Sequence, residues 1–371
     1  MNYSAEQLRT STLRFIRSLK ADDSCIGTYR YSAAVSKATL YASAYAVMTR
    51  SLYNDLIDLS LEEKTTWIDY FDRHQDDDGL YSDPVIWNQG WYKDDPLWCG
   101  RPHLTCHILT ALMCLGSIAK KTFRFLEYYK NEDSMIDWLE KRDWGERISW
   151  TGNEIFNIGI LLQYARDFHD DVDAGKAVNT MLEWLSQHHI CHDTGIWGSL
   201  DILDPLQRSH AVQAAYHWWP LFFYDRFPVP YMERAIDTLL LTQNKSGSFG
   251  WGVHNRQDPF KSSACEDIDS IDPLVRMMHL TAYRRDDISA ALKLAARWVA
   301  KNQVEDGGFV FMLDQPFQYG HIELLGERNQ GAMFPTWFRT LSLALIGESS
   351  TKTTTCKYPW YFTKCPGFHY L

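Results

Sequence analysis

No stretch of the 371-residue sequence approaches the ~20 consecutive apolar residues that a membrane-spanning helix requires. The first residues also lack the apolar centre of a secretory signal, so we expect a cytoplasmic protein. Basic charge is scarce, because 37 Lys and Arg stand against 47 Asp and Glu, and the formal net charge is −10. Phosphate backbones are bound by clustered Lys and Arg, so this balance argues against a nucleic-acid partner.

The motifs of several enzyme classes are missing as well. The sequence has no GxGxxG after a strand, no Walker A motif, no GxSxG elbow and no HExxH. These absences argue against nucleotide-dependent and serine-hydrolase chemistry. The eight cysteines form no CxxC pair, so we expect free thiols and no structural zinc site.

Aromatic side chains, in contrast, are abundant. Phe, Tyr and Trp make up 14% of the chain, with 15 Trp, 20 Tyr and 18 Phe. Large core residues account for most of them, and we expect the others to line a cavity for an apolar or sugar-like ligand.

A turn motif of the form Q-x3-G-x-aromatic recurs along the chain. It occurs at residues 75–81, 243–249 and 303–309, and residues 187–197 contain a longer version. The first interval between these turns is about twice the others, which predicts a degenerate unit near residues 144–152. Repetition at such intervals indicates an architecture of stacked, similar units.

Each turn lies between two kinds of helical pattern. Amphipathic segments, typical of outer helices, cover 5–19, 67–75, 125–141, 181–189, 235–243 and 292–303. Segments apolar all round, typical of buried helices, cover 40–53, 103–116, 154–166, 210–224, 271–283 and 337–347. We therefore predict an all-α, (α/α)6 toroid of six inner and six outer helices over residues 1–347. Residues 348–371 lack a helical period, and we expect them to pack on the barrel as an extension.

Parallel inner helices bring their N-termini to one rim, where candidate site residues are sought. The richest segment holds Glu266, Asp267, Asp269 and Asp272 at the start of an otherwise apolar helix. N-capping explains one or two of these acids, but four exceed that need. Crowded carboxylates beside an apolar cavity retain a proton, so these four residues are the predicted catalytic group.

The starts of other inner helices supply polar and aromatic candidates for substrate binding. His103 and His107, four residues apart, share a helix face, as do Asn153 and Asn157. Without a nearby third ligand, the histidine pair is read as hydrogen-bonding and not as a metal site. The full set of predicted substrate-binding residues is Trp98, Arg101, His103, His107, Asn153, Asn157, His210, Trp251 and Trp337, and His217 is a further candidate.

The glutamine-glycine-aromatic turns resemble the QW-type repeats of the squalene cyclase, oxidosqualene cyclase and protein-prenyltransferase superfamily. In class II terpenoid cyclases a D-x-D-D motif opens an inner helix, and its central Asp protonates the isoprenoid. Asp267-Ile-Asp269-Ser270 is similar, with Ser270 in place of the last Asp. The resemblance implies that Asp269 is the protonating acid and that Asp267 and Glu266 tune it.

Three functions are weighed. In the first, Asp269 protonates the alkene or epoxide of an isoprenoid, and aromatic rings stabilise the resulting cation. If the substrate carries a diphosphate, we expect that group to be held near His103 together with Mg²⁺. Without a diphosphate, no cofactor is expected. In the second, the toroid acts on carbohydrate as a glycosidase, epimerase or polysaccharide lyase, with Asp267 or Asp269 paired with Glu154 or Glu323. In the third, the toroid binds a partner without catalysis. A closed aromatic pocket favours the first, and facing carboxylates in an open groove favour the second.

Overall fold

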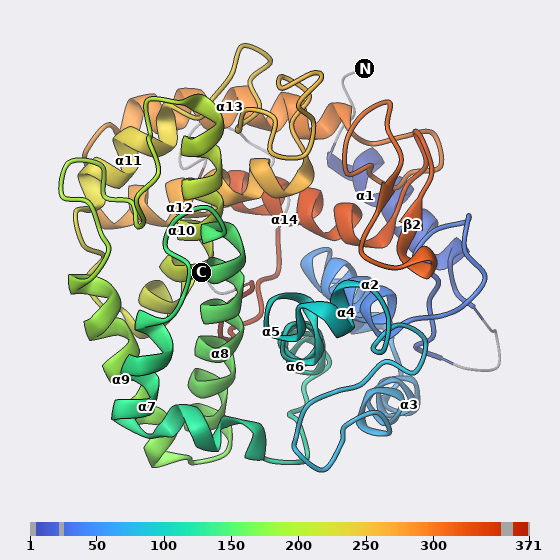
Figure 1. Ribbon diagram of the computed structural model, residues 1–371. Helices are drawn as coiled ribbons and strands as arrows, with labels where there is room; N and C mark the ends of the chain where they lie inside the picture. The colour runs from blue at the N-terminus through green and yellow to red at the C-terminus, as the bar shows by residue number, and fades with distance from the viewer. Residues whose placement is uncertain (1–4, 22–25, 350–358, 370–371) are drawn as a thin grey trace.

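The computed structural model describes residues 5–21, 26–349 and 359–369. Within these ranges an inner ring of helices is wrapped by an outer ring (Figure 1). The inner helices are α2 (Leu40–Leu52), α6 (Arg101–Cys114), α8 (Ile148–Phe168), α10 (Pro205–Asp225), α12 (Ala264–Leu280) and α14 (Met333–Ser349). The outer helices are α1 (Ala5–Ser18), α3 (Leu61–Asp72), α7 (Glu132–Glu140), α9 (Val172–Gln187), α11 (Met232–Leu240) and α13 (Arg285–Lys301).

Short elements occupy the loops between these helices. They are α4 (Trp91–Asp94), α5 (Pro96–Cys99), the 3-10 helices η1 (Asp55–Asp58), η2 (Arg124–Lys130) and η3 (Ile322–Leu324), and strands β1 (Phe317–Gln318) and β2 (Leu325–Gly326). The two strands pair antiparallel, with Phe317 opposite Gly326. Helices α4 and α5 and the β1–β2 hairpin lie in loops that precede inner helices, which places them at the rim formed by the inner-helix N-termini.

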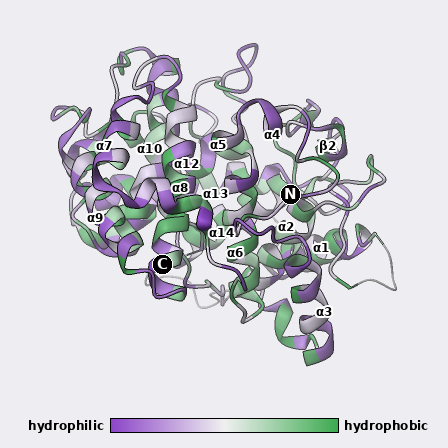
Figure 2. Cartoon of the chain, turned by 60° about the horizontal axis from the view of Figure 1, so that its bottom comes forward, coloured by the Kyte–Doolittle hydropathy of each residue, from purple (hydrophilic) through white to green (hydrophobic). Residues whose placement is uncertain are grey.

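The inner ring is closed, because each inner helix packs on the next and α14 packs on α2. Inner helices are buried nearly all round: α2 buries every residue except Ser51. Outer helices bury one stripe, as α13 does with its apolar residues from Ile288 to Val299. Figure 2 shows hydrophilic and hydrophobic residues alternating along outer helices such as α9 and α3. The predicted all-α toroid of six inner and six outer helices is confirmed.

The glutamine turns are short hairpins that connect outer to inner helices. Backbone bridges join the first and last residues of 75–81, 243–249 and 303–309, and the central glycines have φ between +87° and +93°. The Gln243 amide donates to the carbonyl of its turn glycine at 3.1 Å and to the Ala291 carbonyl of α13 at 2.8 Å. Each glutamine therefore holds its own turn closed and, in this case, ties it to the next outer helix.

The predicted outer segments 67–75, 235–243 and 292–303 each end on the glutamine of a turn, and the observed helices differ from this. Helices α3, α11 and α13 end two or three residues before Gln75, Gln243 and Gln303, so the glutamine opens a hairpin and does not close the helix. A backbone bridge also joins Lys20 and Tyr29 after α1, and Gly27 has φ +100°, although Lys20 stands where the other bridged turns begin with a glutamine.

The degenerate unit near residues 144–152 is a tryptophan turn. The Trp144 indole donates to the Leu139 carbonyl of α7 at 3.0 Å, and Trp197 donates in the same way to the Leu185 carbonyl of α9 at 2.7 Å. The two indoles fix the exits of consecutive outer helices with the same hydrogen bond.

The C-terminal segment 359–369 enters the ring from the C-terminal ends of the inner helices. The Tyr361 amide donates to the Leu52 carbonyl at the end of α2. Further on, the Trp337 indole of α14 donates to His369 Nε2 at 2.8 Å. Glu348 and Ser349, which were expected to belong to this extension, are the last residues of helix α14. Residues 350–358 and 370–371 lie outside the described residues.

Candidate active site

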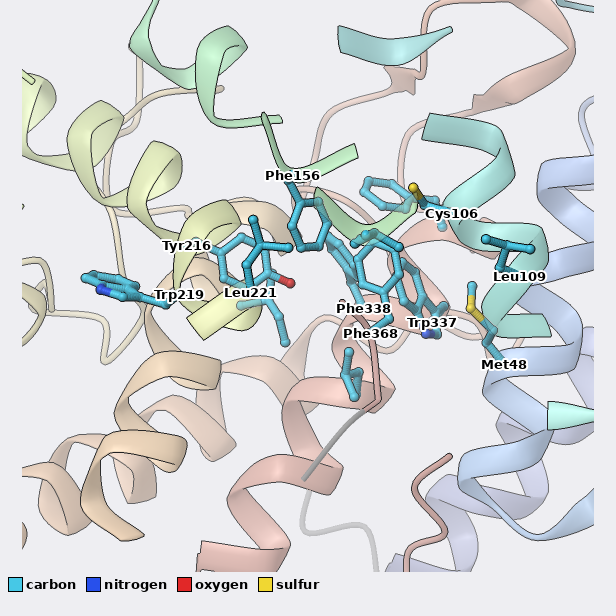
Figure 3. Packing of buried hydrophobic residues seen from close by; sticks show 14 of the residues in the cluster. Met48, Cys106, Leu109, Phe156, Tyr216, Trp219, Leu221, Trp337, Phe338 and Phe368 are labelled. Atoms are coloured by element: carbon cyan, nitrogen blue, oxygen red, sulfur yellow. The ribbon is translucent and has the colours of Figure 1, made fainter. Parts of the chain in front are cut away.

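A cavity of about 270 Å³ lies inside the ring. Its wall is largely aromatic, and Figure 3 shows Phe156, Phe338 and Phe368 gathered between Tyr216 and Trp337. The rings that line it are Trp91, Trp98, Trp150, Phe156, Tyr216, Phe311, Phe317, Tyr319, Phe334, Phe338 and Phe368. Its polar lining is Asp269, Asn153, Gln213, Ser149, Cys265 and the histidines 103, 107, 210, 217 and 254.

Asp269 lies on the cavity wall, in the second turn of α12. Its side chain is buried, and Oδ2 has no hydrogen-bond partner among the described residues. Burial, reinforced by the nearby charges of Glu266 and Asp267, raises the pKa of Asp269 well above its usual value. This rise favours the protonated, uncharged form of the carboxyl group next to an apolar chamber. Among the described residues that line the cavity, it is the single carboxylic acid.

Asp267 points into the protein interior and does not line the cavity. Its Oδ2 accepts from Arg339 at 2.9 Å and from the Trp298 indole at 2.9 Å, and its Oδ1 accepts from the Phe249 amide. Arg339 is fully buried and also donates to the Phe311 carbonyl. Burial raises the pKa of Asp267 to about 6, although Arg339 opposes the rise. The carboxylate is ionised at neutral pH and anchors α12.

The other two acids of the cluster are also bound to partners, and neither lines the cavity. Glu266 and Ser263 form the capping box of α12, and Glu266 also accepts from the Val253 amide. Burial opposes ionisation, but hydrogen bonds from His254 and these amides hold the pKa of Glu266 below its usual value. Asp272 binds Arg276 Nε at 2.5 Å inside the protein. The four predicted catalytic acids are thus divided into one cavity acid and three structural ones.

His103 and His107 both line the cavity. The Tyr41 hydroxyl lies 2.6 Å from His103 Nδ1, and the Tyr319 hydroxyl lies 3.4 Å from Nε2. His107 Nδ1 donates to the His103 carbonyl at 2.8 Å, because a carbonyl can only accept. Burial lowers the pKa of His107 to about 4 and that of His103 well below its usual value. Both rings are neutral, and His107 Nε2 carries a lone pair.

Two further predicted histidines, His210 and His217, line the cavity from α10. They are seven residues apart, which places His217 ~10 Å deeper along the helix axis. Its Nδ1 donates to the Gln213 carbonyl at 2.7 Å, and burial lowers its pKa to about 4. Its Nε2 is therefore a second neutral proton acceptor. No group of three or more His, Cys, Asp or Glu in the described part of the chain is placed to hold a metal ion.

The remaining predicted binding residues divide between wall and support. Trp98 and Asn153 line the cavity, and the amides of Asn153 and Asn157 donate to the Trp98 carbonyl. Asn157 lies behind the wall and holds α5 against α8. Arg101 is bound by the turn carboxylates Asp76 and Asp78, at 2.8 and 2.6 Å, and does not reach the cavity.

The other two predicted tryptophans, Trp251 and Trp337, do not line the cavity. Trp251 stacks edge-on against Phe260 in the loop before α12. Trp337 is fully buried in α14 behind the cavity lining, and its indole binds His369. Trp337 supports the wall from outside through ring contacts with the lining residues Phe334, Phe338 and Phe368.

The sequence interpretation missed the wall residues that come from loops. Phe317 and Tyr319 lie on and after β1, and Phe368 comes from the C-terminal segment. The dense aromatic run between Phe309 and Tyr319 was the available signal. No sequence signal pointed to Phe368, because its position depends on the path of the chain after α14.

No protein-family model matches the sequence, and no curated protein matches it. Solved structures do match. A glycosyl hydrolase of family 88 from Bacteroides vulgatus has a TM-score of 0.53 and 10% identity over 94% of this chain and 99% of that one. A polysaccharide lyase has a TM-score of 0.52 and 9% identity over 95% and 100%. A type II terpene cyclase from Scytonema, in complex with geranylgeranyl dihydroxybenzoate, has a TM-score of 0.48 and 12% identity over 93% and 98%.

At these identities the likeness shows a shared α/α-toroid fold and no more. It leaves the substrate to be argued from the cavity itself. No helix in the described residues is long and apolar enough to cross a membrane.

Proposed function

We propose that this protein is an acid-initiated isoprenoid cyclase. The observation that carries the proposal is Asp269, a buried, neutral carboxylic acid with an unpartnered oxygen on the wall of an aromatic cavity. An unsatisfied buried polar group costs stability, so its retention points to a chemical role. A Brønsted acid facing an apolar chamber is suited to protonating a carbon–carbon double bond or an epoxide.

The first chemical step transfers the Asp269 proton to the substrate. The π electrons of an alkene form the new C–H bond, the adjacent carbon becomes cationic, and Asp269 is left as a carboxylate. Ring faces such as those of Phe334 and Phe338 stabilise the cation as it moves along the chain. Loss of a proton from a neighbouring carbon to Nε2 of His107 or His217 forms the final double bond. Water then returns a proton to Asp269 and removes one from the imidazolium.

The charge of the wall favours an uncharged isoprenoid over a diphosphate. Among the described residues that line the cavity there is no Lys or Arg, and Arg101 is already bound by Asp76 and Asp78. Burial lowers the pKa values of His103, His107, His210 and His217 in the cavity lining, which disfavours their cationic forms. A diphosphate normally needs cationic side chains or a metal ion. We therefore propose a substrate with a neutral reacting end and a reaction that does not use Mg²⁺.

The glycosidase form of the carbohydrate alternative is less well supported by the same geometry. Glycoside hydrolysis normally uses two carboxyl groups that face each other across the sugar. Glu154 binds Arg142 at 2.7 Å, and Glu323 accepts from the Ser36 and Lys37 amides. Neither lines the cavity with Asp269. A toroid that only binds a partner does not explain an unpartnered acid inside the ring.

The test compares Asp269→Asn with Asp269→Glu. The protein is incubated with labelled isoprenoid epoxides, isoprenoid phenols, isoprenoid diphosphates and acidic oligosaccharides, and the products are resolved by chromatography. We expect the neutral isoprenoids to be cyclised, Asp269→Asn to abolish turnover, and Asp269→Glu to retain a measurable part. Asp237→Asn, the same change on outer helix α11, is the control and should keep full activity.

Thermal unfolding separates lost chemistry from lost structure. Because Asp269 Oδ2 has no partner to lose, Asp269→Asn should change stability by less than ~1 kcal/mol. Full activity in that variant would refute the assignment of the acid. Degradation of the oligosaccharides without cyclisation of any isoprenoid would instead establish the carbohydrate alternative.

A further inference from the structure

The end of the chain forms part of the cavity wall. Phe368 lines the cavity and is 5% exposed. Its ring centroid lies 4.7 Å from that of His107, 5.2 Å from Trp337 and 5.3 Å from Phe156. These three side chains belong to α6, α14 and α8, so Phe368 sits between helices on different sides of the ring (Figure 3).

Contacts to several inner helices fix this segment in place. Besides the bonds of Tyr361 and His369 to α2 and α14, Thr363 Oγ1 lies 3.2 Å from Cys114 Sγ at the end of α6. Gly367 has φ +82° and lies so close to Ile160 of α8 that a Cβ atom would overlap that side chain. A residue other than glycine there would push the neighbouring ring out of its position.

Different parts of the chain therefore form the mouth and the floor of the cavity. The mouth lies at the N-terminal ends of the inner helices, near His210 and His254, and Asp269 is in the second turn. The floor lies deeper, where Phe368 contacts His107 and Phe156. An elongated ligand that enters at the mouth meets the Phe368 ring at the other end.

We propose that Phe368, delivered by the C-terminal segment 359–369, is the floor of the reaction chamber and limits the length of the hydrocarbon chain that the cavity accepts. The inference rests on the proposed function for its substrate class, but its geometry is a property of the cavity alone. Replacing the phenyl ring by a methyl group opens space bounded by His107, Trp337 and Phe156. Phe368→Trp introduces a larger indole ring, which takes up space that a ligand can occupy in the wild-type protein.

The experiment measures binding of n-alkyltrimethylammonium ions of increasing chain length by titration calorimetry. Aromatic walls bind quaternary ammonium ions, and each buried methylene should tighten binding about fourfold until the chain reaches the floor. We expect affinity to level off at a certain length in the wild type, at a longer one in Phe368→Ala and at a shorter one in Phe368→Trp. Phe362→Ala, on the same segment but away from the cavity lining, should leave the limit unchanged.

The outcomes distinguish this inference from the proposed function. The same limiting length in wild type, Phe368→Ala and Phe368→Trp, each folded by circular dichroism, would overturn the role of Phe368. If Phe368→Ala does not fold, the shorter limit of Phe368→Trp decides the question. A shifted limit in a protein that turns over no isoprenoid would retain the floor and reject the cyclase assignment. Where cyclisation is observed, Phe368→Ala should shift substrate preference toward longer chains.

Discussion

The ion pair between Asp267 and Arg339 gives the sharpest stability prediction. Both side chains are 0% exposed, and Arg339 also donates to the carbonyls of Val310 and Phe311, each at 2.9 Å. Arg339→Met has a similar length but no charge and no donors. It leaves the Asp267 carboxylate buried with the Trp298 indole and a backbone amide as its remaining partners. Breaking a buried pair in this way typically costs about 3–5 kcal/mol.

A double-mutant cycle shows whether the pair itself carries this cost. Asp267→Asn leaves the Arg339 charge buried without its counter-ion, so it should also be costly, again by about 3–5 kcal/mol. The double variant has neither uncompensated charge, so its loss should fall short of the sum by about 2–3 kcal/mol. The magnitude is large because neither charge is in contact with water.

The assay is urea unfolding at neutral pH followed by circular dichroism. Arg284→Met is the matched control, since Arg284 is 37% exposed and pairs with Asp237 and Asp287 at the surface. It should cost less than ~1 kcal/mol. A loss below 1 kcal/mol for Arg339→Met, or additive losses in the cycle, would show that the pair does not hold α12 as argued.

Two further predictions concern pH and backbone conformation. Burial lowers the pKa of His107 and His217 to about 4, so between about pH 4 and 6.5 the unfolded chain binds more protons than the folded one. The free energy of unfolding should therefore fall as the pH is lowered through this window, by up to ~1.4 kcal/mol per pH unit for each imidazole, and His217→Gln should remove its share of the slope in urea titrations. Gly307 has φ +93° and no room for a Cβ beside the main chain of α1, whereas Gly116 has φ +80° and open space around it. Gly116→Ala should cost ~1 kcal/mol and Gly307→Ala at least ~2 kcal/mol in thermal unfolding; equal costs would show that the close approach is not a constraint.

The ring of helices was predictable because inner and outer helices have different surroundings. An inner helix such as α8 contacts protein on every side, and its sequence is apolar all round. An outer helix such as α13 meets water on one side, and its polar residues follow that side. The helices α4 and α5 were not foreseen, since four-residue helices have too few turns to show a period.

The candidate site was predictable in position but not in the roles of its acids. The rule that function lies at the starts of inner helices led to Asp269, which does line the cavity. The sequence alone does not predict which of the four acids lacks a partner, because the partner of Asp267 is Arg339, which lies 72 residues away in the chain. The same applies to Phe368, whose contacts with α6 and α8 depend on the path of the chain outside the repeats.

Two of the three acids that do not line the cavity, Glu266 and Asp267, help to raise the pKa of the fourth, Asp269. Glu266 and Asp267 are held as anions by amides, His254 and Arg339, and both lie within reach of Asp269. Ionising Asp269 would place a third negative charge in the same buried region without a donor to receive it. Burial supplies the largest part of the pKa rise and the two anions add to it. The hydrogen bonds that anchor α12 in the core and hold Glu266 and Asp267 as anions therefore also contribute to the raised pKa of its cavity-facing carboxyl, so stability and proposed chemistry depend in part on the same contacts.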